Sequence, residues 1–204
     1  MFDHSHLPNI GLTEGKIPDQ IYQALNREIV DIHTNDKDIV RMNKSLAGQI
    51  TKEYEISKSR TLLDPFLEEM GRAYQKEWNY YPKENPNNNN LTVESVWVNM
   101  QKKLEVNPLH NHDGTLSFVA WLYVPFKLED ERNVENCKNS RTVELASTFQ
   151  FVYTTALGNI SNCPMFVENG WEGRICMLPA KLLHIVYPFQ TSDGYRISIA
   201  GNLY

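Results

Sequence analysis

The spacing of hydrophobic residues divides the chain into a helical first part and a strand-rich second part. A helix is predicted to begin just after Pro18. Its apolar residues recur every three or four positions and are Ile21, Leu25, Ile29 and Ile32. Similar stripes predict two further helices, over residues 36–50 and 61–80. Such stripes are core packing far more often than cofactor sites, so we interpret them as a helical layer.

The period of the pattern changes from near four to two after a polar, proline-interrupted stretch at residues 81–90, which is predicted to be a loop. In residues 93–101, Trp97, Asn99 and Gln101 alternate with apolar residues, so the two sets lie on opposite faces of a strand. Further strands are predicted at residues 116–124, 145–153, 173–178, 183–187 and 195–203. The charged segment between residues 127 and 141 indicates an exposed excursion.

Helices followed by a run of short strands indicate an α+β fold in which a helical layer packs on a β-sandwich or barrel. A strand-rich part of about 110 residues with long insertions suits closure as a jelly roll. We therefore expect one domain, with residues 1–90 as an N-terminal helical elaboration and residues 91–204 as the β core.

Composition and charge narrow the class of protein. The formal net charge of −5 and the pI near 5.7 argue against nucleic acid as a partner, because such proteins usually carry a basic face. No apolar run is long enough to span a membrane, and the N-terminus does not read as a signal peptide. Three scattered cysteines (Cys137, Cys163 and Cys176) form no CxxC pair, which favours free thiols and a cytoplasmic location.

Three of the six histidines lie in the strand-rich part and are candidate metal ligands. His110 and His112 are two residues apart, so on an extended backbone their rings point to the same face. A His-x-His pair also occurs by chance on solvated loops. The third, His184, lies in an apolar run, where a buried imidazole needs a partner. A metal ion would be such a partner, and so would an ordinary hydrogen bond in the core.

The last predicted strand carries a candidate anion site. Arg196 and Ser198 share one face of residues 195–203, and a guanidinium beside a hydroxyl suits a carboxylate. The alternative is a surface strand with an ordinary salt bridge.

These motifs, in this order, resemble the 2-oxoglutarate/Fe(II)-dependent oxygenase superfamily. The motifs are His110-x-His112, a Gly-x-Leu-Ser strand from Gly114, Met-Leu-Pro-x-x-Leu-x-His-x-Val-x-Pro around His184, and Arg-x-Ser-x-x-x-Asn from Arg196. The chain looks most similar to uncharacterised 2OG-Fe(II) oxygenases of bacteria and marine phages. The resemblance spans about residues 92–202. It implies a double-stranded β-helix and a non-haem dioxygenase that uses Fe(II), 2-oxoglutarate and O2 to hydroxylate a primary substrate.

The resemblance also implies roles for single residues. The positions of His110, His112 and His184 match the iron ligands. Arg196, with Ser198 as a helper, matches the residue that receives the far carboxylate of 2-oxoglutarate. The resemblance further points to cosubstrate contacts at Asn99, Gln101 and Tyr123.

One position departs from the family pattern. The second ligand is ordinarily Asp or Glu, and two histidines with one carboxylate are the common set, whereas this chain has His112. Asp113 is the alternative ligand, if a bulge turns it inward. We prefer the three-histidine set, which also leaves room for an inactive or repurposed member.

Two other functions compete with the oxygenase. A cupin-like metal-binding protein or enzyme would use the same barrel without 2-oxoglutarate and would make no demand on Arg196. A non-enzymatic sandwich, such as a phage structural protein, would bind no metal. For the oxygenase, peptidyl and small-molecule substrates are both open, and a homodimer would be ordinary for the class. We expect specificity to come from residues 130–140, residues 159–170 and the N-terminal helices.

Overall fold

The computed structural model describes residues 11–34, 39–81 and 91–204, and its core is two antiparallel β-sheets that face each other. The larger sheet has the order β1-β8-β5-β10-β3-β2. Its strands are β1 (Thr13–Lys16), β8 (Arg174–Pro179), β5 (Leu116–Tyr123), β10 (Arg196–Leu203), β3 (Val93–Gln101) and β2 (Glu53–Glu55). The smaller sheet, in the order β4-β9-β6-β7, holds β4 (Asn107–His110), β9 (Leu183–Val186), β6 (Phe149–Thr154) and β7 (Ile160–Met165). The predicted α+β jelly roll is confirmed.

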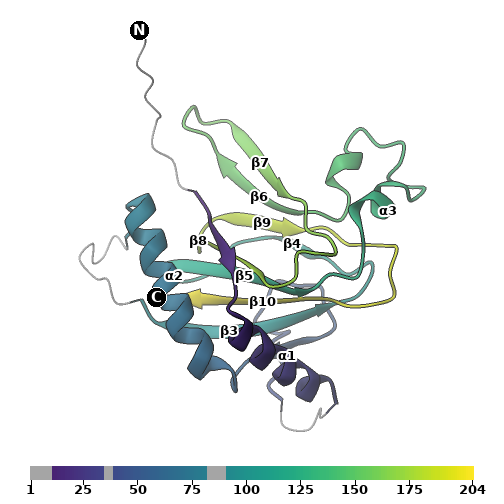
Figure 1. The fold of residues 1–204 in the computed structure, drawn as a ribbon. Helices are drawn as coiled ribbons and strands as arrows, with labels where there is room; N and C mark the ends of the chain where they lie inside the picture. Colours follow the sequence, from purple (N-terminus) through teal and green to yellow (C-terminus); the bar gives the residue numbers. More distant parts are fainter. Residues whose placement is uncertain (1–10, 35–38, 82–90) are drawn as a thin grey trace.

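The two long helices form a layer on one side of the larger sheet. Figure 1 shows α1 (Asp19–Thr34) and α2 (Arg60–Trp78) at one side of the molecule, with β6 and β7 at the other. Both helices agree with the predicted ones to within a few residues. The charged excursion contains the short helix α3 (Leu128–Arg132) and is followed by a 3-10 turn, η1 (Val143–Leu145).

Each face of the larger sheet buries its own apolar core. The outer core lies between the sheet and the helices and contains Leu25, Leu67, Val98, Phe118 and Ile199 among its members. The inner core lies between the two sheets and contains Trp121, Phe149, Phe151, Leu178 and Phe189. The period-two alternation of the strands divides their side chains between these cores.

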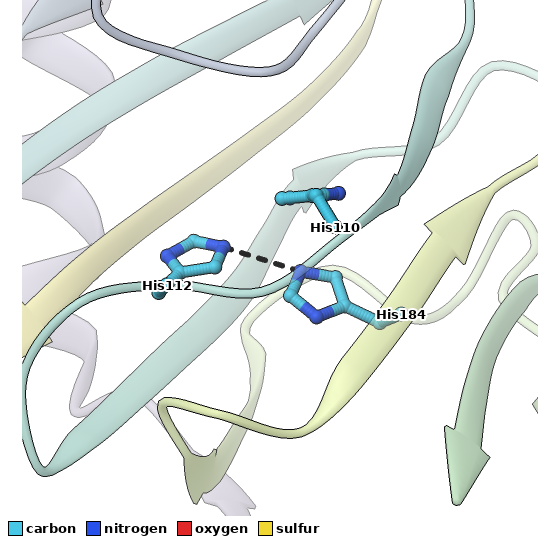
Figure 2. A group of neighbouring side chains, drawn as sticks. All are labelled: His110, His112 and His184. Atoms are coloured by element: carbon cyan, nitrogen blue, oxygen red, sulfur yellow. Dashed lines mark hydrogen bonds between the residues drawn. The ribbon is translucent and has the colours of Figure 1, made fainter.

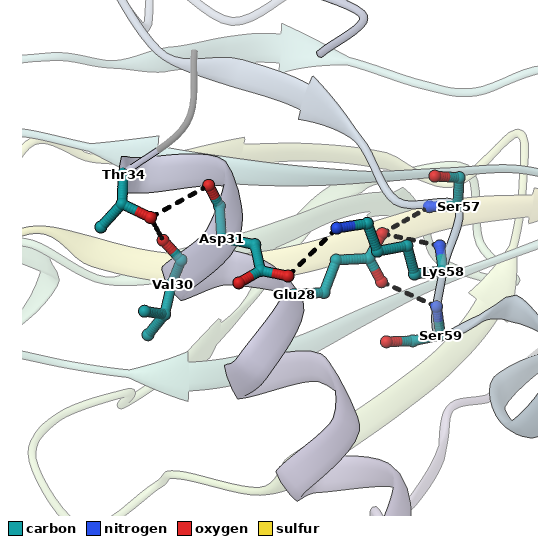
Figure 3. A network of polar contacts seen from close by, with 7 residues as sticks. All are labelled: Glu28, Val30, Asp31, Thr34, Ser57, Lys58 and Ser59. Atoms are coloured by element: carbon teal, nitrogen blue, oxygen red, sulfur yellow. Dashed lines mark hydrogen bonds and ion pairs between the residues drawn. The ribbon is translucent and has the colours of Figure 1, made fainter. Parts of the chain in front are cut away.

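A buried carboxylate joins the two helices to each other. Glu28 of α1 is 4% exposed, and its oxygens accept hydrogen bonds from the backbone N–H groups of Ser57, Lys58 and Ser59 at 2.7, 2.8 and 2.7 Å (Figure 3). These residues directly precede α2, whose own N-cap, Ser59, makes no side-chain cap. Glu28 therefore satisfies donors that a helix N-terminus leaves open and places negative charge at its positive end.

The helix predicted over residues 36–50 is wrong for the part that the structure describes. Residues 35–38 lie outside the described residues, and residues 39–50 form turns and isolated bridges. Two of their backbone donors bind outside the segment: Met42 N–H donates to Glu53 O of β2, and Gln49 N–H donates to Val106 O, both at 2.9 Å. Ser45 N–H donates to Met42 O in a turn. This segment thus bridges the two sheets, and its apolar residues cover the space between them.

The remaining predictions differ mainly at strand ends. The predicted strands correspond to β3, β5, β6, β8, β9 and β10, whereas β1, β2, β4 and β7 were missed because each is short or half-exposed. Residues N-terminal to position 90 supply both edge strands of the larger sheet, β1 and β2. Except for Tyr81, the predicted loop at residues 81–90 lies outside the described residues, as does the N-terminal stretch 1–10. In the described part, no helix is long and apolar enough to cross a membrane.

Candidate functional site

The three histidines of the strand-rich part meet between the two sheets. His110 ends β4 and lies directly opposite His184 of β9. His112 follows β4, where its backbone N–H donates to Ala180 O at 2.8 Å. The chain then turns at Gly114, whose φ of +95° favours glycine. The rings converge in Figure 2, and one ligand atom from each lies within 4.8 Å of the others.

Hydrogen bonds at the Nδ1 atoms orient all three rings in the same way. His110 Nδ1 lies 2.6 Å from Pro108 O, and His184 Nδ1 lies 3.0 Å from Leu182 O. His112 Nδ1 lies 2.9 Å from Asn202 Oδ1 and 3.2 Å from Ser117 Oγ, whose own hydrogen is donated to Gly201 O. Because all of these partners accept, each Nδ1 carries the proton, and each Nε2 presents a lone pair.

The Nε2 atoms of His112 and His184 are 3.2 Å apart. With both protons on Nδ1, this contact is a repulsion between lone pairs and not a hydrogen bond. Two imidazoles bound at right angles to one ion at about 2.1 Å would lie about 3 Å apart. Carbonyl and amide partners on the other ring nitrogen are also what metal-bound histidines ordinarily have. The residues present therefore fit a metal ion.

Burial keeps these imidazoles neutral. Burial, with a smaller effect of the charges of His110 and His112, lowers the pKa of His184 to about 3. Burial and the charge of His110 lower the pKa of His112 to about 4. The pKa of His110 is also lowered by burial. A metal ligand must be unprotonated, so at neutral pH no proton competes with a cation at this cluster.

Two aromatic rings form walls beside the cluster. Trp97 of β3 stacks on His112 with ring centroids 5.4 Å apart, and Phe149 of β6 stacks on His184 at the same separation. These contacts fix the planes of two of the three imidazoles, and they exclude water from one side of each ring.

Arg196 of β10 is a buried cation that lines the same cavity. It is 3% exposed, and burial lowers its pKa to about 9, while the charge of Glu131 raises it. Its Nε and Nη2 both donate to Gln101 Oε1, at 3.0 and 2.7 Å. Its other bonds go to the carbonyls of Ser147 and Tyr187. Among the described residues no carboxylate lies within 4.0 Å of the guanidinium, so the buried charge has no counter-ion in contact.

A cavity of about 230 Å³ connects the histidine cluster and Arg196. On its larger-sheet wall, Asn99 pairs with Ser198 and Gln101 pairs with Arg196 across neighbouring strands. The structure thus brings together the three histidines, Arg196, Ser198, Asn99 and Gln101, which come from four different strands and one connecting segment.

The sequence model of a family described as "Putative 2OG-Fe(II) oxygenase" matches residues 95–202, which is more than half of the chain. The chain belongs to this family. No curated protein matches it. A solved prolyl-4-hydroxylase from Pseudomonas putida is 10% identical with a TM-score of 0.55, and the alignment covers 95% of this chain and 92% of that one.

A second solved structure is the non-heme alpha-ketoglutarate-dependent epimerase SnoN from nogalamycin biosynthesis. It is 11% identical with a TM-score of 0.54, and the alignment covers 96% of this chain and 78% of that one. A third, AviO1 from Streptomyces viridochromogenes, is 12% identical with a TM-score of 0.52 and coverages of 95% and 89%. At such identities these likenesses show that the oxygenase shares their fold.

Two of the predicted site residues of this oxygenase lie away from the cluster. The exposed carboxylate of Asp113 pairs with Lys181 Nζ at 3.0 Å, and Asp113 does not belong to the group of convergent ligand atoms. Tyr123 is 48% exposed and does not line the cavity. A bulge in β5 is the cause, because the register with β10 shifts between Trp121 and Tyr123 and pairs Tyr123 with Ile197 on the outer face.

The cavity of the oxygenase also has a wall that the sequence patterns did not reveal. Ser45, Leu46, Ala47 and Ile50 line it from the segment that was predicted to be a helix, and Glu53 lines it from β2. None of the described residues in 130–140, 159–170 or the N-terminal helices lines it. Glu53 gave no signal in the sequence because three-residue β2 is too short for a period, and its burial depends on pairing with distant β3.

Proposed function

We propose that this family member is an active Fe(II)- and 2-oxoglutarate-dependent dioxygenase that hydroxylates a peptidyl or small-molecule substrate. Two findings together support this: three convergent Nε2 lone pairs, and, on the wall of the same cavity, a buried guanidinium with no carboxylate of the described chain within 4.0 Å. The first suits a cation and the second suits an anion. Iron(II) and the far carboxylate of 2-oxoglutarate supply that pair of charges.

In this proposal His110, His112 and His184 hold the iron through Nε2, and His112 takes the place of the usual carboxylate. The bound iron and cosubstrate would supply the oxidising chemistry by which O2 attacks a C–H bond. Asp113 is left out as a ligand, because its carboxylate already pairs with Lys181 at the surface. Three neutral ligands leave the site one charge more positive than the common set, which favours binding of an anionic cosubstrate.

The surrounding residues orient the ligands and the cosubstrate. Asn202 and Ser117 hold the His112 tautomer. Arg196, with the Ser198 hydroxyl beside it, receives the far carboxylate of 2-oxoglutarate. Gln101 orients Arg196, because its carbonyl oxygen already accepts two guanidinium hydrogen bonds. Asn99 lies next to Ser198 and can donate from its amide to the same carboxylate.

A cupin-like activity without 2-oxoglutarate is the second candidate. The all-histidine ligand set favours it, because such a set needs no acidic ligand and no cosubstrate. So do the four hydrogen bonds that Arg196 already makes within the protein. This candidate predicts metal binding that is indifferent to substitution of Arg196. A cytoplasmic location and a homodimer stay predictions.

The deciding experiment is anaerobic visible spectroscopy of the purified protein. A weak charge-transfer band that needs both iron(II) and 2-oxoglutarate is expected, absent in His184→Ala and weakened in Arg196→Ala. His33→Ala and Arg174→Ala are matched controls, because both side chains are exposed and lie outside the cavity. Iron binding without a 2-oxoglutarate band would support the cupin-like candidate. Failure to bind iron would overturn both.

A further inference from the structure

The end of the cavity formed by the segment of residues 39–53 is rich in hydrogen-bond acceptors that have no donor. Glu53 Oε1, Asn99 Oδ1 and Asn107 Oδ1 are all buried and make no hydrogen bond to any residue that the structure describes, and all three residues line the cavity. Glu53 is 0% exposed and Asn99 is 7% exposed. A buried polar atom without a partner is costly, so three that line one cavity indicate that a ligand supplies the donors.

The carboxylate of Glu53 is held on one side only. Asn43 Nδ2 donates to Oε2 at 3.2 Å and to Ile50 O at 2.6 Å, which ties Glu53 to the covering segment. Oε1 lies against the bare backbone of Gly48, where an added Cβ would stand 2.3 Å from it. No Lys, Arg or His nitrogen of the described chain lies within 4.0 Å of this carboxylate. Glu53 lines the cavity, and its carboxylate has no counter-ion among the described residues.

The cosubstrate cannot supply the missing donors. At neutral pH 2-oxoglutarate carries two carboxylates and a ketone, which only accept hydrogen bonds, and the ionised form of Glu53 would repel its charge. Arg196 of β10 pairs with Gln101 of β3, whereas Glu53 of β2 pairs with Asn99, two residues earlier on the same strand. The wall thus presents a cationic residue, Arg196, that suits an anion. Beside it lies an anionic residue, Glu53, that suits a second molecule.

We infer that Glu53, with Asn99 and Asn107, binds a cationic nitrogen group of the primary substrate, an ammonium or a guanidinium. This inference rests on the proposed function only in calling that molecule the substrate. The binding site itself is defined by the three acceptor oxygens. Asn99 lies between Arg196 and Glu53. Its side-chain NH2 group can donate toward the cosubstrate while its oxygen accepts from the cation.

The protonation of Glu53 supports the same assignment. Burial raises the pKa of its carboxyl to about 7, and the nearby charge of Glu105 adds to the shift, against a lowering by Asn43. A cation at Oε1 would stabilise the charged carboxylate that burial disfavours.

Binding to the metal-free protein tests the inference apart from any reaction. The probes are n-butylamine and agmatine, with n-butanol as a neutral match and butyrate as an anionic one, and binding is followed by calorimetry at pH 8. The amines are expected to bind in preference to the alcohol and the acid. Glu53→Gln is expected to weaken amine binding by about tenfold to a hundredfold, as for a charged hydrogen bond.

Glu55→Gln is the matched control, because it removes the same charge from the same strand at an exposed side chain that does not line the cavity. It should leave amine binding unchanged. Equal binding of alcohol and amine, or equal loss in the two variants, would overturn the inference. If Glu53→Gln does not fold, the preference of the wild-type protein among the four probes decides alone.

A second arm separates the two proposals and the source of the cation. Free lysine and arginine, and short peptides that contain them with blocked ends, are added to the iron-loaded protein with 2-oxoglutarate, and succinate is measured. Stimulation by the peptides alone assigns the cation to a side chain of a peptide, and stimulation by the free compounds assigns it to a small molecule. Glu53-dependent amine binding without any 2-oxoglutarate turnover would refute the dioxygenase and leave the cation site standing. A charge-transfer band with iron(II) and 2-oxoglutarate, but without amine binding, would refute the cation site and leave the dioxygenase standing.

Discussion

The two faces of the larger sheet use the same strands for different purposes. On β3, Val96 and Val98 turn outward into the apolar core beneath the helices, while Trp97 and Asn99 turn inward to the cavity. The outer face is lined mainly by apolar side chains that pack against the helices, although the buried amide of Gln75 in α2 makes no hydrogen bond to a described residue. The inner face holds imidazole lone pairs, a guanidinium without a carboxylate and acceptor oxygens without donors. It is the gathering of several such groups around one cavity that indicates a binding site, whereas the apolar packing of the outer face contributes to stability.

The largest expected effect is a loss of metal affinity when one histidine of the inner face is removed. His184→Ala removes one of the three convergent ligands and should lower the affinity for manganese(II) or cobalt(II) by more than about a hundredfold, since loss of an outer partner alone costs 10–100-fold. Calorimetric titration of the metal-free protein measures this. His33→Ala, on the exposed end of α1, is the control and should bind as the wild type does. Equal affinity in the two variants would show that the cluster is structural.

The second-largest effect should be a loss of folding stability, without a loss of metal affinity, when a residue of the outer face is shortened. Leu67 of α2 is 0% exposed in the outer core, so Leu67→Ala should lower the free energy of unfolding by about 3 kcal/mol. Denaturant titration measures the loss. Leu62→Ala on the same helix, at a residue 39% exposed, should lose much less. Metal affinity should stay unchanged in both variants, and a parallel fall would mean that the two faces are not independent.

The outer face was the more predictable of the two. The helical stripes of α1 and α2 and the alternation in β3 and β10 follow from local periods, so these four elements could be predicted from the sequence. The same alternation predicts the inward-facing set Trp97, Asn99 and Gln101. Histidine spacing likewise suggested a metal cluster, and the strand register places His110 opposite His184. These features depend on neighbours in the chain or on short motifs.

On the inner face, the sequence failed to predict the residues whose position depends on pairing between segments far apart in the chain. Residues 39–50 have a helical stripe, but their backbone donors go to β2 and to Val106. Tyr123 has the correct parity for the cavity, but one bulge turns it outward. Glu53 becomes a buried cavity residue only because β2 pairs with β3. None of these outcomes leaves a mark in the local pattern.

The third prediction concerns the pH dependence of the free energy of unfolding, to which Glu53 of the inner face should contribute. The pKa of Glu53 is raised from 4.5 to about 7, so between these values the folded state holds a proton that the unfolded state has lost. Stability should therefore fall as pH rises from about 5 to 7, by up to about 3 kcal/mol. Glu53→Gln should remove this fall and be more stable than the wild type at pH 8, as measured by denaturant titration at each pH. A wild-type profile identical to that of the variant would contradict the raised pKa. Glu55→Gln, at an exposed side chain on the same strand, should keep the wild-type slope.

The smallest effect should come from a residue that touches no metal. Asn202 Oδ1 accepts from His112 Nδ1 at 2.9 Å, and Ser117 Oγ, at 3.2 Å, is a second acceptor for the same hydrogen. Because Ser117 remains, Asn202→Ala should lower manganese(II) affinity by only about tenfold, at the lower end for an outer partner. Asn202→Ala combined with Ser117→Ala should lose clearly more than either variant alone. If the double variant binds as tightly as the wild type, the tautomer of His112 is not set by these two oxygens, and the lone-pair argument for the inner face fails at that ring.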